Sequence, residues 1–165
     1  MNFFLIGNQG GSCDDYFVLN DPTRNSEYLN SDFYCDRVGY SSSYMSTSPD
    51  WQGAAWYRMA EPAGITIPEE PVDMDHCNTY VTGWLNGHHP TTVGETINGK
   101  VCFNKFAGSV LNSCYEETQI KIKHCISYYL YYLVDAPNCN LRYCSTSTTL
   151  IGTYYVKTKQ TEIIQ

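Results

Sequence analysis

Basic residues are scarce in this chain of 165 residues, which has ten lysines and arginines against seventeen aspartates and glutamates. The formal net charge is −7, and no run of lysine or arginine supplies the positive patch that binding to phosphate groups requires. The composition therefore argues against a protein that binds nucleic acid or an anionic membrane surface.

No stretch of the sequence is apolar enough to cross a bilayer as a helix. The most apolar one, residues 128–134, is far shorter than the roughly 20 residues that a transmembrane helix needs. The opening residues 1–6 are too few for the apolar region of a signal peptide, and no basic residue precedes them. If the protein is secreted, we expect that its signal has been removed or that the chain is part of a longer one.

Three short signatures are also missing. The sequence has no Cys-x-x-Cys pair of the kind that zinc sites use, no Gly-x-Ser-x-Gly nucleophile motif and no Asn-x-Ser/Thr acceptor for N-linked glycans. These absences argue against a zinc ribbon and against an α/β-hydrolase, and they exclude standard N-glycosylation.

Cysteine, by contrast, is abundant. Its count is even and its spacings are long and irregular, which favours four disulfides over metal ligation. Four disulfides require an oxidising compartment, so we expect an extracellular protein. Eight cysteines allow on the order of a hundred pairings, so spacing alone does not assign them. The eight are Cys13, Cys35, Cys77, Cys102, Cys114, Cys125, Cys139 and Cys144.

Short alternating stretches between turn-forming residues predict an all-β fold of disulfide-stapled antiparallel sheets, with long loops and strand-like terminal tails. Residues 120–123 alternate apolar and charged side chains, and residues 128–134 are expected to pair with them. Residues 96–103 are expected to form two strands that turn at Asn98-Gly99. Residues 150–157 are another β-rich stretch.

Several motifs between residues 13 and 145 occur in the order and spacing of a known family. Trp56-Tyr57-Arg58 is followed by Trp84-Leu85-Asn86-Gly87-His88-His89-Pro90 and then by Cys139-Asn140-Leu141-Arg142-Tyr143-Cys144. These motifs resemble the eight-cysteine domain of the family of uromodulin and the pancreatic zymogen-granule membrane glycoprotein. The resemblance implies an extracellular, non-enzymatic β domain of a mosaic protein. The two best-known members act as decoys that capture bacterial adhesins through their glycans.

The resemblance also implies how the cysteines pair. A ten-cysteine version of the domain has two further cysteines that bond to each other. Both are absent here, one at Glu69-Glu70-Pro71 and one beside Cys114. The remaining bonds, carried over position by position, are Cys13–Cys125, Cys35–Cys139, Cys77–Cys144 and Cys102–Cys114.

The motif positions have expected structural roles. We expect Trp56, Tyr57 and Trp84 to be core aromatics. Arg58 is expected to pair with a carboxylate or to cap carbonyls, with a ligand role as the alternative. Asn86-Gly87 is expected to form a tight turn before Pro90.

Residue types that bind metals or catalyse reactions are present, but not in a pattern typical of either. His88 and His89, with His76, suggest a metal, yet adjacent residues of an extended segment point to opposite faces, and we expect a structural turn. Asp73 and Asp75 lie outside any calcium-loop pattern. We therefore predict no metal, no cofactor and no catalytic residue.

Two tracts are rich in serine and threonine, at residues 41–49 and 145–149. They are either a solvated loop and a linker or, in an extracellular protein, sites of O-glycosylation. The candidate acceptors are Ser41, Ser42, Ser43, Ser46, Thr47, Ser48, Thr146, Thr148 and Thr149.

Apolar residues cluster at both ends of the chain, which we divide into an N-terminal tail (1–12), the eight-cysteine domain (13–145) and a β-rich C-terminal tail (146–165). Each tail either completes the domain's own sheet or adds as a strand to a neighbouring copy. A head-to-tail contact that does not close builds a filament. The candidate assembly residues are Phe3, Phe4, Leu5, Ile6, Leu150, Ile151, Tyr154 and Val156.

The sequence thus predicts a non-enzymatic structural protein, secreted or on the cell surface, that self-assembles head-to-tail into a filament or matrix. An uneven charge distribution, net −10 over residues 1–99 and +3 over residues 100–165, favours that contact. The alternative is a binding or decoy module of a mosaic protein that engages glycans or adhesins. The missing N-glycan acceptors weaken it, because the family's decoys present N-glycans.

Overall fold

The computed structural model describes residues 12–29, 33–107 and 109–147, and within them the regular structure is β apart from one turn of 3-10 helix. The predicted all-β class is confirmed. The strands are β1 (Phe17–Leu19), β2 (Phe33–Cys35), β3 (Met45–Thr47), β4 (Ala55–Met59), β5 (Val81–Leu85), β6 (Thr96–Ala107), β7 (Val110–Cys125), β8 (Tyr128–Leu133) and β9 (Leu141–Tyr143), and the helix is η1 (Pro22–Arg24).

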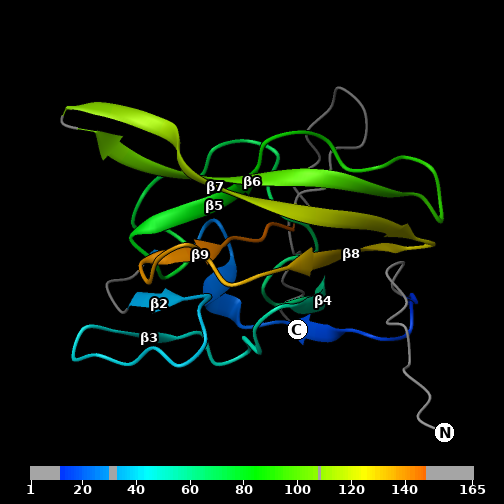
Figure 1. Ribbon diagram of the computed structural model, residues 1–165, viewed down its shortest axis with the longest axis horizontal. Helices are drawn as coiled ribbons and strands as arrows, with labels where there is room; N and C mark the ends of the chain where they lie inside the picture. Colours follow the sequence, from blue (N-terminus) through cyan, green and yellow to red (C-terminus); the bar gives the residue numbers. More distant parts are fainter. Residues whose placement is uncertain (1–11, 30–32, 108, 148–165) are drawn as a thin grey trace, which may run out of the picture.

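Seven strands form one sheet in the order β1-β4-β8-β7-β6-β5-β9, and β2 pairs with β3 in a second, smaller sheet. The long β6–β7 hairpin spans the width of the molecule, and the β2–β3 pair lies on the opposite side of β9 from it (Figure 1). The predicted pairing of residues 120–123 with residues 128–134 is confirmed, because β7 and β8 pair antiparallel through Lys121–Tyr132 and Cys125–Tyr128.

The sheets are not antiparallel throughout. The five central strands pair antiparallel as expected, but β1 with β4, β5 with β9, and β2 with β3 are parallel pairs. A parallel pair needs a long connection, and here the chain passes through other strands or long loops between the two partners. Alternating side chains identify a strand but carry no information on the direction of its neighbour.

The prediction of a turn at Asn98-Gly99 is wrong. β6 continues through both residues, which lie opposite Lys121 and Ile120 of β7. A Cβ atom on Gly99 would come within 2.9 Å of the Ile122 side chain. Gly99 therefore makes room for a neighbouring core residue, and the dipeptide that favours a hairpin turn is overridden by the strand pairing around it.

The core is centred on stacked aromatic rings. The ring of Trp51 stacks on that of Tyr57 at 4.9 Å and lies 5.6 Å from that of Tyr143, which is 5.6 Å from the ring of Phe103. All four side chains are buried. The indole N–H of Trp51 donates to Asp135 at 2.9 Å, so burial leaves no polar atom of the ring unpaired.

Glycine is required at Gly83 of β5 because the backbone of β9 passes close by. A Cβ atom there would lie 2.8 Å from the carbonyl oxygen of Arg142 and 2.7 Å from the ring of Phe103. We predict that Gly83→Ala lowers the free energy of unfolding by about 1–3 kcal/mol in urea titrations. Gly99→Ala is the matched control, because the added Cβ atom would meet the end of the Ile122 side chain rather than backbone. Equal losses in the two variants would contradict the prediction.

Candidate functional site

The eight cysteines form four disulfides, and none is free. Two of the bonds join residues 112 and 104 positions apart. They tie the segment before β1 to the end of β7 and the end of β2 to the segment before β9, and they restrict the unfolded chain. The pairs, which are those that the family resemblance implies, are Cys13–Cys125, Cys35–Cys139, Cys77–Cys144 and Cys102–Cys114.

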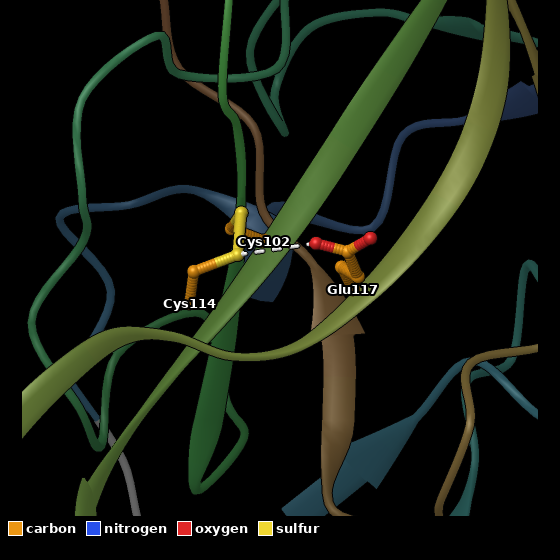
Figure 2. Close-up of side chains that lie close together, drawn as sticks. All are labelled: Cys102, Cys114 and Glu117. Atoms are coloured by element: carbon orange, nitrogen blue, oxygen red, sulfur yellow. Dashed lines mark hydrogen bonds between the residues drawn. A yellow bond between two sulfur atoms is a disulfide. The ribbon is translucent and has the colours of Figure 1, made fainter.

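Figure 2 shows a group of side chains that resembles a metal site, formed by Cys102, Cys114 and Glu117. The two sulfur atoms are bonded to each other, so neither offers the thiolate that binds a metal. The carboxylate of Glu117 lies 3.9 Å from the sulfur of Cys114 and pairs with the ammonium group of Lys100 at 3.0 Å. This cluster braces the β6–β7 hairpin.

A buried arginine lies between two carboxylates. Arg24 is fully buried in η1 and donates to Asp36 at 2.7 and 2.8 Å and to Asp50 at 2.6 Å. Burial alone would lower the pKa of Arg24, but the charges of Asp36 and Asp50 raise it above the ordinary value. Burial likewise opposes ionisation of Asp50, and the charge of Arg24 outweighs it and lowers the pKa. These charges are internal and paired.

A second buried arginine, Arg142 of β9, completes this polar layer. It donates to the hydroxyl of Thr23 at 2.8 Å and to the carbonyl of Cys77 at 2.9 Å, and it lies 3.5 Å from the carboxylate of Asp21. Burial and the nearby charge of Arg24 lower the pKa of Arg142 to about 10. Both guanidinium groups therefore hold η1 against β9.

A chain of hydrogen bonds joins an acid, a histidine and a hydroxyl. The carboxylate of Glu69 lies 2.5 Å from Nδ1 of His89, and Nε2 of His89 lies 2.7 Å from the hydroxyl of Tyr131. The hydroxyl accepts the backbone N–H of Ile67 at 3.2 Å. The order resembles that of an activated nucleophile, but Tyr131 is fully buried and burial raises its pKa, so its hydroxyl cannot reach a substrate.

The adjacent histidines share one carboxylate but differ in environment. The side chain of His88 is 90% exposed, and its hydrogen bond to Glu69 at 2.8 Å raises its pKa. His89 is packed inside, where burial lowers its pKa despite the same carboxylate. His76 bonds to the carbonyl of Met74 instead, and among the described residues no metal-like group includes any of the three histidines.

The Trp56-Tyr57-Arg58 motif lies in β4, where alternate side chains face opposite sides. Tyr57 is in the core, whereas Trp56 is half-buried and its ring lies 5.6 Å from that of Tyr132. Arg58 also differs from expectation, because its guanidinium lies over the ring of Tyr128 at 4.1 Å rather than beside a carboxylate. The aromatic surroundings of Arg58 favour this cation–π contact.

The second motif follows the end of β5. Trp84 is buried and its indole N–H donates to the carbonyl of Ser113 at 2.7 Å. The chain bends at Asn86 and Gly87, and the side chain of Asn86 lies 3.3 Å from the sulfur of Cys102. Pro90, which follows His89 in the sequence, is buried. These residues position the loop that carries the histidines.

The serine and threonine candidates for O-glycosylation differ in how accessible they are. Ser48 is buried, and its hydroxyl donates to the carbonyl of Cys35, while that of Thr47 donates to the carbonyl of Arg37 at 2.7 Å. The hydroxyl of Ser42 accepts backbone N–H groups of its own turn. Ser41 and Ser43 are exposed, whereas Ser46 and Thr146 are half-buried. Thr148 and Thr149 lie outside the described residues.

Five residues with structural roles belong to no pattern that the sequence alone makes visible, namely Arg24, Asp36, Asp50, Glu69 and Trp51. Arg24 is one of three basic residues among the first 99, and this scarcity was the only signal that it has a special environment. The proposed assembly residues Phe3, Phe4, Leu5, Ile6, Leu150, Ile151, Tyr154 and Val156 all lie outside the described residues.

Comparison with known proteins identifies the family. Residues 57–145 match the model of the uromodulin-like eight-cysteine domain. The chain belongs to the uromodulin-like domain family. It is 31% identical over 141 residues to the pancreatic secretory granule membrane major glycoprotein GP2 of Rattus norvegicus, covering 83% of this chain and 23% of that protein. Uromodulin of the same species is 32% identical over 137 residues, covering 82% of this chain and 20% of uromodulin.

This uromodulin-like chain therefore spans about a quarter or less of the length of these relatives. Four disulfides and this family membership make the protein extracellular, either secreted or at the cell surface. Within the described residues, no helix has the length and hydrophobicity that crossing a bilayer requires.

Removing one carboxylate beside Arg24 should destabilise the uromodulin-like domain strongly. Asp36→Asn leaves a buried guanidinium without its bidentate partner, and we predict a loss of about 3–5 kcal/mol in the free energy of unfolding. The measurement is urea denaturation of the oxidised protein. Asp73→Asn, at an exposed position, is the control and should change stability by less than about 0.5 kcal/mol. Similar values for both variants would refute the role of the buried pair.

The two adjacent histidines should affect acid stability in opposite directions. The pKa of His89 is below its ordinary value of about 6.5, so the unfolded chain protonates first and stability falls as the pH falls from 7.5 to 5.5. The pKa of His88 is raised, so its protonation favours the folded state.

We therefore predict that His89→Gln reduces this loss of stability and that His88→Gln increases it. Thermal unfolding of both variants and the wild type at pH 7.5 and 5.5 measures the two effects. Parallel pH profiles in all three proteins would show that neither imidazole titrates differently on folding.

Proposed function

We propose that this uromodulin-like domain is a non-enzymatic building unit of an extracellular filament or matrix, in which a terminal segment of one copy adds as a strand to the next. The observation that carries the proposal is the open sheet. In the part of the chain that the structure describes, the sheet begins at β1 and ends at β9 without these two strands pairing, and β1 carries exposed apolar side chains. An open apolar edge is a template for pairing with another chain.

The polar clusters support a structural role rather than catalysis. The cysteine pair near Glu117 is a disulfide, and the chain from Glu69 to Tyr131 ends at a buried hydroxyl. The buried arginines hold η1 and the loop at Cys77 against β9. In each case the residues that would bind a metal or react with a substrate are bonded to other residues of the protein.

Rigidity is the second requirement of a building unit. Three of the four disulfides connect segments at least 67 positions apart in sequence, and the fourth, Cys102–Cys114, cross-links the β6–β7 hairpin. Cross-links of this kind restrict the unfolded chain and stabilise the folded unit, which suits a protein outside the cell.

We predict that the full chain forms oligomers or fibres and that residues 12–147 alone stay monomeric. The cut is placed after Ser147 because Thr146 pairs with Thr66 and the hydroxyl of Ser145 donates to Ala63 at 2.8 Å. Sedimentation velocity and negative-stain imaging of both oxidised proteins measure the difference. Absence of free thiols and an unchanged circular dichroism spectrum control for folding.

A full chain that sediments as a single species near 18.8 kDa would contradict the assembly proposal. That outcome would favour the alternative, a binding or decoy module that engages glycans or adhesins. Assembly of the 12–147 fragment would instead show that the contact lies within the described residues.

A further inference from the structure

Among the described residues, no strand lies beside β1 on the side away from β4. Phe17 and Val18 are 51% and 43% exposed, and β1 lies at the end of the sheet beside β4. The carbonyl of Leu19 accepts the N–H of Ala60, so the backbone groups of Phe17 and Leu19 face β4 in the parallel ladder. The N–H and C=O of Val18 therefore point outward, and no described residue bonds to them.

The other edges are covered or interrupted in the described part of the chain. β9 is fully buried, and its Leu141 carbonyl accepts the N–H of Asp36. The outer side of β3 is bonded to the chain before it, through Met45 and Thr47. The part of β7 that extends past β8 has an edge that β8 does not cover. This edge is interrupted by an irregularity in the β6–β7 pairing, and there the carbonyl of Ser113 already accepts a hydrogen bond from the indole N–H of Trp84. Strand β1 is the edge best suited to accept a strand.

The charge around β1 selects between the two terminal segments. The exposed Asp14 and Asp15 precede β1, and the exposed Glu61 follows Ala60, which bonds to the end of β1. Residues 1–11 carry no charged side chain, whereas residues 150–159 combine apolar residues with Lys157 and Lys159. An antiparallel strand with Tyr154 opposite Val18 brings Lys157 opposite Asp15, so the second segment matches the edge in both charge and hydrophobicity.

We propose that β1 is the acceptor edge and that residues 150–157 of a second copy of this chain form the donated strand. The inference rests on the proposed function, because it names the contact by which copies join. The outward N–H and C=O of Val18 pair with the donated backbone, and the apolar side chains of Phe17 and Val18 become covered.

The first test removes the outward donor without touching the bonds to β4. Val18→Pro deletes the N–H that faces the added strand, and the extended Phe17 tolerates a following proline. We expect the concentration needed for assembly of the full chain to rise at least about tenfold, since a donated carbonyl is left unpaired. Sedimentation velocity across a concentration series measures it.

The matched control changes another exposed valine to proline. Val93 precedes Gly94, which has φ +86°, in a turn closed by the bond from Glu95 N–H to the carbonyl of Thr92. Proline is favoured at this position of such a turn, so Val93→Pro should leave assembly unchanged. Thiol titration and circular dichroism confirm that both variants are folded and oxidised.

The second test identifies the occupant through charge reversal. Lys157→Glu should weaken assembly because the new carboxylate would lie opposite the carboxylate of Asp15. Adding Asp15→Lys to the same chain should restore assembly. Rescue in the double variant, with loss in each single variant, supports the pairing of these two residues.

The outcomes separate this inference from the proposed function. A monomeric wild-type chain overturns both. Wild-type assembly with unchanged assembly of Val18→Pro overturns β1 as the acceptor while the filament role stands. Loss in Val18→Pro without rescue in the charge-reversal pair overturns residues 150–157 as the donated strand.

Discussion

The buried guanidinium of Arg24 is the constraint on which the rest of the structure depends. Its fork binds Asp36 after β2, Asp50 before β4 and the carbonyl of Tyr143 in β9, three segments far apart in the chain. A buried charge without partners costs several kcal/mol, so these segments are held at hydrogen-bond distance once the domain closes. Asp36 also accepts the N–H of Tyr143, which places that ring against Trp51 and Tyr57.

Polar chemistry in this domain serves to hold irregular segments in place. With long loops and few aliphatic side chains per strand, the fold uses disulfides and buried hydrogen bonds where a larger domain would use hydrophobic area. Glu69, His89 and Tyr131 anchor the loop after β5 to β8 in this way. These three residues resemble an active site, but their hydrogen bonds hold a loop against the sheet.

An open sheet and a rigid frame together favour a role in assembly. The disulfides cross-link the unit, while among the described residues β1 has one unpaired backbone edge and two partly exposed apolar side chains. The acidic residues flanking β1 and the lysines of residues 150–159 are opposite in charge, which is the basis of the proposed pairing between copies. A contact between different surfaces of identical copies extends into a filament unless its geometry closes.

The sequence by itself determined the all-β class, the extracellular setting, the family and the strand pair formed by β7 and β8, because these follow from cysteine usage, motif order and local alternation. The cysteine pairing followed from the family and not from spacing. Only the tertiary structure decided that Gly99 lies within a strand, that β1 is parallel to β4, and that Arg24 is buried between Asp36 and Asp50. Strand direction and ion pairing join residues far apart in the chain, so no local pattern records them.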